Sequence, residues 1–159
     1  MRKIRRKVFE TNSSSIHAIS IGGKKPIRYV PEVLHFHFGE FGWEADYANP
    51  ADYLYTGIYG YFSDDNELIN QWLNYISETL ARHGCKAIFH TNPPEAWWEH
   101  GYIDHSSELY ELFEYLSDED HLLGYLFGDT CIKTGNDNND YDVTFESNED
   151  TAIEILKVN

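Results

Sequence analysis

The chain has 159 residues, of which 42% are hydrophobic and 16% aromatic, and its formal net charge is −15. This length accommodates one domain with its own hydrophobic core, and the aromatic content argues against a disordered acidic tail. No apolar run has the length of a membrane span, and none follows the basic N-terminus as it would in a signal peptide.

Positive and negative charges are divided unevenly along the chain. Residues 1–28 hold eight of the twelve Lys and Arg residues and one acid, a net charge of +7, whereas residues 29–159 hold four bases and 26 acids, a net charge of −22. Cys85 and Cys131 each lie in a short apolar run, which is typical of buried, reduced thiols in a cytoplasmic protein. We therefore expect a cytoplasmic protein with a basic segment, 1–28, and an acidic body, 29–159.

The N-terminal segment predicts a β-hairpin. Arg2–Phe9 alternates basic and apolar residues, as a strand does, and Glu10–Ser15 consists of turn-forming residues. Ile16–Ile21 follows as a second strand, which Gly22 and Gly23 end.

A third strand and two helices are predicted next. Val33–Phe38 reads as a strand with Leu34, Phe36 and Phe38 on one face and Val33, His35 and His37 on the other. Asn49 and Pro50 predict the start of a short helix that continues through Ile58. Ser63 is expected to cap a longer helix that ends at Gly84. The apolar stripe of that helix is Leu68, Ile69, Trp72, Leu73, Ile76 and Leu80.

The second half predicts three strands and three further helices. Cys85–His90 reads as a buried strand, and Thr130–Lys133 with Tyr141–Phe145 as a hairpin about the turn Gly135–Asn139. Three more helices are expected: one capped by Ser106 or Ser107 that buries Leu109, Leu112, Phe113 and Leu116, one from Ser117 to Gly128, and one capped within Ser147–Asp150 that runs through Ile153 and Leu156. Without a regular βαβ repeat, this order predicts a single α+β domain over residues 1–159, with a mixed or mainly antiparallel sheet and helices packed on it.

The helix pair predicted after Ser106 concentrates negative charge. Neighbouring acids three residues apart repel each other by about 0.2–0.5 kcal/mol per pair, and no Lys or Arg occurs between Lys86 and Lys133 to compensate them. Carboxylates spaced like phosphates can occupy a basic nucleic-acid-binding groove, with tyrosines supplying apolar contact area. The alternative is a solvated surface, since acids in first helical turns are stabilising for local reasons. The candidate partner-binding residues are Glu108, Glu111, Glu114, Asp118, Glu119 and Asp120, with Tyr110 and Tyr115.

A short string near the N-terminus resembles a known signature. Phe9–His17 reads F-E-T-N-S-S-S-I-H and resembles the opening F-E-T-N-S-S-S-x-H-S of a group of small proteins of Firmicutes and their phages, with Ala18 where that pattern often has Ser. The stretch Thr134–Asn138 is a second feature that this chain shares with that group. The resemblance carries over no activity, but it implies a phage or mobile-element setting, in which small acidic proteins often inhibit host defence systems.

Together the charge and the resemblance predict a non-enzymatic, anti-CRISPR-like inhibitor that acts in the cytoplasm of a bacterial host. Its partner is expected to be a basic, nucleic-acid-binding defence nuclease. By mimicking nucleic acid, the inhibitor would occupy the binding surface of that nuclease and keep nucleic acid away from it. Direct contact with nucleic acid is expected only through the basic N-terminal hairpin, which could equally dock on the acidic body. A structural protein of a virion is a further alternative.

The string also contains an alternative catalytic pair. Ser15 and His17 of the Ser13–Ser15/His17 segment can lie on one side of a strand, as a small hydrolase or nucleotide-modifying enzyme would require. The sequence offers no nucleophile elbow and no acid spaced to orient the imidazole, whereas Asn and Ser side chains commonly close turns.

Histidines and an acidic turn raise the question of metal ions. His35 and His37 share a strand face, a spacing that suits a transition metal, and His100, Asp104 and His105 form another group, yet neither has the ligand number of a zinc motif. The oxygen-rich run 135–142 lacks the glycine that an EF-hand loop requires at its sixth position, so a hairpin turn is the better interpretation. The sequence therefore predicts no cofactor, with His35 and His37 as the alternative metal ligands.

Overall fold

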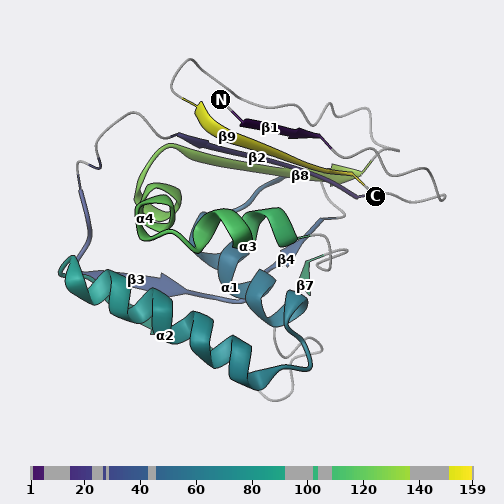
Figure 1. The fold of residues 1–159 in the computed structure, drawn as a ribbon. Coiled ribbons are helices and arrows are strands. Elements are labelled where there is room, and N and C mark those ends of the chain that lie inside the picture. The colour runs from purple at the N-terminus through teal and green to yellow at the C-terminus, as the bar shows by residue number, and fades with distance from the viewer. Residues whose placement is uncertain are drawn as a thin grey trace.

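The computed structural model describes residues 2–5, 15–22, 27, 29–42, 46–91, 102–103, 109–136 and 151–158. Its largest sheet has the strand order β1-β9-β2-β8-β5 (Figure 1). β1 pairs in parallel with β9, and the other pairs are antiparallel. The strands of this sheet are β1 (Arg2–Arg5), β2 (Ser15–Gly22), β5 (Asp46–Tyr47), β8 (Thr130–Asn136) and β9 (Thr151–Val158).

The described helices all lie on one side of this sheet (Figure 1). They are α1 (Pro50–Tyr61), α2 (Asn66–Arg82), α3 (Tyr110–Leu116) and α4 (Glu119–Phe127). α4 packs against β2 and β8, whereas α2 lies farther from the sheet. A mixed sheet with helices on one face confirms the predicted α+β fold. None of the helices in the described ranges combines the length and the apolar character that crossing a bilayer requires.

Two small parallel sheets accompany the large one. β3 (Val33–Phe36) pairs with β6 (Lys86–Phe89), and β4 (Glu40–Phe41) pairs with β7 (Tyr102–Ile103). The strands predicted at Val33–Phe38 and Cys85–His90 are thus present, each somewhat shorter than expected. The burial expected for the second is wrong, because Lys86 is exposed and the rest of β6 is only half-buried. Phe36 is fully buried while His35 and His37 are exposed, as the alternation predicts.

Three of the four described helices, α1, α2 and α4, start after a residue whose side chain accepts a backbone N–H. Asn49 caps α1, as predicted, through Oδ1 and the N–H of Asp52 at 3.2 Å. Asp65, not Ser63, caps α2, and Asp118, not Ser117, caps α4. The carboxylates of both residues accept the N–H three positions on, and their negative charge interacts favourably with the helix dipole. The cap predicted at Ser106 or Ser107 is wrong, because α3 begins at Tyr110 after Leu109, which makes no side-chain capping hydrogen bond. The two serines themselves lie outside the described residues.

The hydrophobic core lies between the large sheet and the helices. The stripe predicted on α2 is buried at Ile69, Ile76 and Leu80 but 37% exposed at Leu68. The helix around Leu109–Leu116 buries the four residues expected of it. The largest fully buried side chains are Phe36, Ile19, Ile21, Tyr53, Leu54, Tyr55, Ile58, Ile76, Leu80, Leu112, Leu116 and Tyr125.

The predicted N-terminal hairpin is wrong. β1 and β2 are both strands, but β9 lies between them and pairs with each. A hairpin was expected because the two strands are neighbours in sequence. β9 is the more apolar partner, and Ile153 and Ile155 bury their side chains opposite Ile21 and Ile19 of β2. The basic strand is left at the edge, where charged strands are common.

The predicted C-terminal helix is also wrong, because residues 151–158 form β9. Ile153 and Ile155 alternate toward the core, and β-branched residues favour a strand. The predicted strand at Thr130–Lys133 is present and continues through Gly135 and Asn136, which were expected to begin a turn. Its antiparallel neighbour is β2, and the expected partner Tyr141–Phe145 lies outside the described residues.

Candidate functional site

The predicted acidic residues form a strip along α3 and α4. Glu114, Asp118, Glu119 and Asp120 are exposed, and Glu111 is partly buried. The two helices follow each other with only Ser117 and Asp118 between them, so the acids are continuous along the surface. We call Glu111, Glu114, Asp118, Glu119 and Asp120 the acidic strip. Glu108 lies outside the described residues.

Asp118 and Glu119 of the strip interact with neighbouring groups of the fold. The Asp118 carboxylate caps α4 and lies 4.0 Å from Nδ1 of His121. The Glu119 carboxylate forms an ion pair with Arg82 at the end of α2, and both side chains are 50% exposed. An ion pair this exposed contributes at most about 1 kcal/mol to stability. Within the described ranges, the carboxylates of Glu114 and Asp120 have no basic partner.

The Arg82→Gln variant tests this local neutralisation. Removing the cation leaves the Glu119 carboxylate for an external partner, so we expect a roughly two- to fivefold gain in affinity for a cationic ligand. The melting temperature should change by no more than about two or three degrees. Titration of an arginine-rich peptide into both proteins by calorimetry measures the difference, and weaker binding by the variant would contradict the expectation.

An open aromatic groove lies beside the acidic strip. Gln71, Trp72 and Tyr75 of α2 and Ser117 line this cavity of about 220 Å³, which we call the α2–α3 groove. The Tyr75 hydroxyl donates to the carbonyl of Leu116 at 2.9 Å, and the Trp72 ring packs edge-on against Phe113 at 5.1 Å. These contacts hold α2 against α3, so the groove is part of the folded framework.

The electrostatic environment of the groove is negative. Burial, together with the carboxylates of Glu119 and Asp118, raises the pKa of Tyr75 to about 12, although Arg82 acts in the opposite direction. The phenol is therefore neutral at physiological pH, and the two carboxylates lie close enough to act on it. A cationic side chain entering the groove meets both an aromatic surface and negative charge.

The two tyrosines of the predicted partner-binding set have different surroundings. Tyr110 is 54% exposed, as an aromatic contact residue would be. Tyr115 stacks on the imidazole of His121, with ring centroids 4.0 Å apart, and its pKa is raised by burial and by Asp118. Tyr115 thus holds the α3–α4 junction together, whereas Tyr110 presents its ring to solvent.

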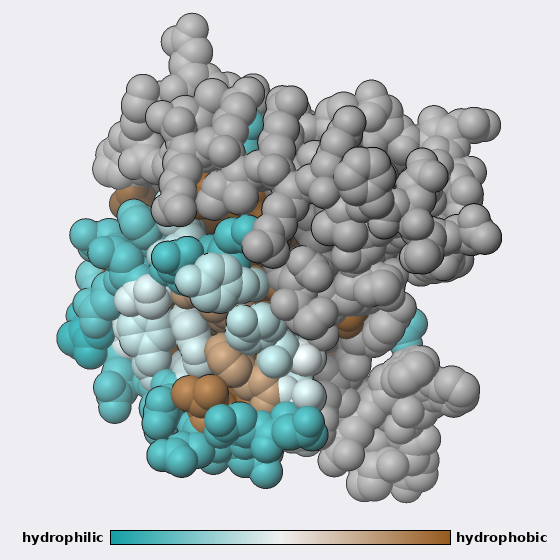
Figure 2. Space-filling model, turned by 45° about the vertical axis from the view of Figure 1, so that its right-hand side comes forward, coloured by the Kyte–Doolittle hydropathy of each residue, from teal (hydrophilic) through white to brown (hydrophobic). Residues whose placement is uncertain are grey.

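Residues of hydrophilic or intermediate hydropathy, coloured teal or near white, make up most of the described surface in Figure 2. The strongly hydrophobic colour there is confined to small areas between them. A surface of this character suits polar, charge-assisted association better than a large apolar interface.

The described part of the basic segment lies away from the acidic strip. Arg2, Lys3 and Arg5 belong to β1, which occupies the sheet edge beside β9, whereas α4 packs under β2 and β8 (Figure 1). The backbone of β1 therefore does not cross α3 or α4. The remaining bases of residues 1–28 lie outside the described residues.

The alternative catalytic pair is divided between the core and the end of β2. His17 is fully buried, and its Nδ1 lies 2.6 Å from the hydroxyl oxygen of Tyr53 on α1. Burial raises the pKa of Tyr53 far above its ordinary value, so the phenol stays protonated. The backbone of Ser15 lies in β2, opposite Asn136. The imidazole of His17 is thus closed to solvent and packs against α1 through Tyr53.

The Tyr53→Phe variant measures the contribution of this buried pair. The substitution removes the hydroxyl that contacts His17 while it keeps the ring, so we expect a loss of about 1–3 kcal/mol in the free energy of unfolding. Urea denaturation followed by circular dichroism gives the value. An unchanged midpoint would mean that the contact contributes nothing to stability.

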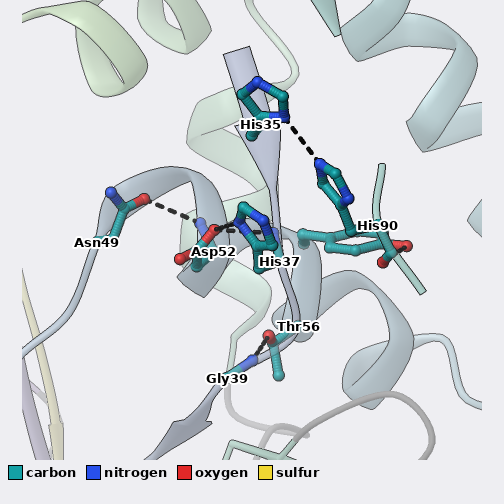
Figure 3. Close-up of polar contacts among 8 residues, drawn as sticks. His35, His37, Gly39, Asn49, Asp52, Thr56 and His90 are labelled. Carbon is teal, nitrogen blue, oxygen red and sulfur yellow. Dashed lines mark hydrogen bonds and ion pairs between the residues drawn. The ribbon is translucent and has the colours of Figure 1, made fainter. Parts of the chain in front are cut away.

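The alternative metal ligands His35 and His37 have a third histidine beside them. His90, at the end of β6, places its Nε2 2.8 Å from Nδ1 of His35, and its ring stacks on that of His37 (Figure 3). Within the described ranges, no three or more His, Cys, Asp or Glu side chains are arranged to hold a metal ion. His100, Asp104 and His105 lie outside the described residues, as does Asp137–Asp142 of the acidic turn.

The sequence alone does not predict the residues that line the α2–α3 groove or the position of His90 beside His35. The helical spacing of Trp72 predicts a core position. The relation of Gln71 and Tyr75 to Ser117 is not visible in the sequence, because it arises only from the packing of α2 on α3. The relation of His90 to His35 depends on the parallel pairing of β3 and β6. In the sequence, only the apolar character of both strands indicates that β3 and β6 could pair.

No family model, no curated protein and no solved structure matches this chain.

Proposed function

We propose that this protein is a non-enzymatic inhibitor of the phage or mobile-element type that acts in the bacterial cytoplasm. Its acidic strip and the α2–α3 groove bind the basic nucleic-acid-binding surface of a host defence protein, in the anti-CRISPR-like manner of a nucleic-acid mimic. The observation that carries the proposal is the groove itself: exposed carboxylates adjoin an aromatic cavity, and burial together with the charges of Glu119 and Asp118 raises the pKa of Tyr75 there.

The chemistry of the groove favours a Lys or Arg side chain of the partner. A cation above the Trp72 or Tyr75 ring is attracted by about 0.5–2 kcal/mol, depending on how far it is desolvated. The nearby Asp118 carboxylate adds charge-assisted hydrogen bonds, and the Glu119 carboxylate does so where the incoming cation displaces Arg82 from it. A guanidinium fits best, because its plane stacks on an aromatic ring while its edge meets a carboxylate.

The wider strip supplies the long-range part of the interaction. Glu114 and Asp120 are exposed acids without a basic partner in the described ranges, and they flank the α3–α4 junction. Their charge accelerates association with a basic surface and opposes approach to nucleic acid itself. Occupation of the basic surface then excludes the phosphates that normally bind there.

A competition experiment tests the proposal. Fluorescently labelled nucleic acid is bound to each of several purified, basic host nucleases, CRISPR effectors among them, and this protein is titrated in at about 0.1 M and about 0.5 M salt. We expect displacement of nucleic acid from at least one nuclease at the lower concentration and a much weaker effect at the higher. Failure to displace nucleic acid from any member, or displacement that salt does not weaken, would contradict the proposal.

A further inference from the structure

Arg82, at the end of α2, shows how the acidic strip holds a guanidinium group. Its Nη2 atom donates to Oε1 of Glu119 in α4 and, at 3.2 Å, to Oγ1 of Thr79. In the part of the chain that the structure describes, this ion pair joins one guanidinium nitrogen to one carboxylate oxygen. Arg82 therefore uses only one of the two oxygens that Glu119 offers.

The ion pair adjoins the α2–α3 groove through Tyr75. Tyr75, Thr79 and Arg82 follow one another at helical spacing, so they lie along one side of α2. Tyr75 lines the groove, and the charges of Glu119 and Arg82 both act on its hydroxyl. The groove and the ion pair therefore form one continuous region between α2 and the α3–α4 junction.

The size of the groove matches a single side chain. Its volume of about 220 Å³ lies below the roughly 300–1,000 Å³ of typical small-molecule pockets. Trp72 and Tyr75 supply its aromatic surface. A long basic side chain can lay its stem on these rings and bring its charged end to Glu119.

The internal ion pair is weak enough to be exchanged. The side chains of Arg82 and Glu119 are each 50% exposed, and ion pairs this exposed contribute little to stability. Glu119 lies in the first turn of α4, where the helix dipole stabilises its charge after Arg82 has left. A guanidinium that pairs with both carboxylate oxygens is bound more strongly than one that uses a single oxygen. Because Nη2 of Arg82 occupies Oε1, that arrangement requires Arg82 to leave.

We propose that Glu119 recognises an arginine of the partner, and that Arg82 occupies this site until the partner's arginine replaces it. The incoming guanidinium donates two parallel hydrogen bonds to Oε1 and Oε2 of Glu119 and stacks on the ring of Tyr75, while Arg82 turns into solvent. Lysine does not replace Arg82 in this way, because an ammonium group lacks the planar fork of a guanidinium. The exchange rests on the proposed function, and it makes arginine the residue that the partner contributes.

A double-mutant cycle tests the exchange. The wild type, Arg82→Gln, Glu119→Gln and the double variant are titrated by calorimetry with an arginine-rich peptide at about 0.1 M salt. We expect Arg82→Gln to bind roughly two to five times more tightly than the wild type, and Glu119→Gln to bind about tenfold more weakly. In the Glu119→Gln background, Arg82→Gln should change the affinity by less than about 1.5-fold, because Arg82 no longer competes for a carboxylate.

The side chain of Arg82 gives a second readout, by nuclear magnetic resonance. The arginine-rich peptide should move the signal of the Arg82 Nε–H group towards that of an arginine free in solvent. A lysine peptide of equal length and charge should leave the signal in place. A signal that saturating arginine peptide does not move, or that both peptides move equally, would overturn the proposed exchange.

The Lys86→Gln variant is the matched control for charge. Lys86 is an exposed base at the start of β6, outside α2, α3 and α4, so its substitution removes the same charge from another place. It should change the affinity by less than about 1.5-fold. Circular dichroism establishes that each variant is folded. An equal gain from Arg82→Gln with and without Glu119, or no peptide binding by the wild type, would overturn the proposal.

The peptide measurements and the nuclease competition can fail separately. Coupling between Arg82 and Glu119 in the peptide cycle, without displacement of nucleic acid from any nuclease, would retain the arginine site and reject the proposed inhibitor function. Displacement of nucleic acid by a protein whose peptide cycle shows no coupling would retain the function and reject the exchange.

Discussion

Replacing both Glu114 and Asp120 with lysine should lower the affinity for the cationic partner at least ~100-fold at physiological salt. Each substitution converts an attraction into a repulsion, and neither carboxylate caps a helix or has a basic partner in the described ranges. The free energy of unfolding should fall by only about 1–2 kcal/mol, because Asp120 lies in the first turn of α4, where a lysine is unfavourable. Calorimetry gives the affinity and urea denaturation the stability. A double variant that binds like the wild type would move the interface elsewhere.

A matched control separates the position of the charges from their number. Glu32→Lys with Glu40→Lys makes the same change in net charge at two exposed sites outside α2, α3 and α4. The loss of affinity should be severalfold at most, from the long-range field alone. Equal losses in the two double variants would indicate that total charge, and not the acidic strip, governs binding.

The Ile155→Ala variant should lose about 2–5 kcal/mol in the free energy of unfolding. Ile155 is 5% exposed, faces the helices from an interior strand and lies opposite Ile19. Truncation removes buried apolar surface and leaves a cavity that the strand cannot close. Urea denaturation of the variant and of the wild type measures the loss.

The Leu68→Ala variant serves as the control for Ile155→Ala. Leu68 is 37% exposed on α2, where alanine is also the better helix former, so its loss should stay below about 1 kcal/mol. An Ile155→Ala variant as stable as Leu68→Ala would contradict the placement of β9. It would favour the surface helix that local sequence signals suggest for this segment.

The helices were predictable because their signals are local. Asn49 followed by Pro50 gave the start of α1, and the apolar stripe of α2 gave its buried side. The caps of α2 and α4 were misplaced by two residues and one residue, since Ser63 and Asp65, or Ser117 and Asp118, are both competent caps. Only the positions of the N–H groups in the folded helix decide between them.

The sheet was less predictable because its pairings are remote in sequence. β1 pairs with β9 across most of the chain, and nothing local in Arg2–Arg5 indicates that partner. In β9 the acids that precede Thr151 resemble a helix start. The alternation of Ile153 and Ile155 was the competing signal, and burial on the sheet decided in its favour.

The candidate site shows the same contrast between local and remote signals. The acidic strip was predictable because its members lie close together in sequence, whereas the α2–α3 groove joins Trp72 to Ser117 through packing. The ion pair of Arg82 with Glu119 shows what charge counting overlooks. A base 37 residues away neutralises one of the acids that the sequence leaves uncompensated.

Mapping the binding of an arginine-rich peptide by nuclear magnetic resonance tests the central claim most directly. The ¹⁵N-labelled protein is titrated at low and at high salt. The account predicts that the largest shift changes fall on the Trp72 indole N–H and on the amides of Gln71, Tyr75, Ser117 and Asp120, and that salt abolishes them. Shift changes spread evenly over all exposed acids, or centred away from α2, α3 and α4, would contradict it.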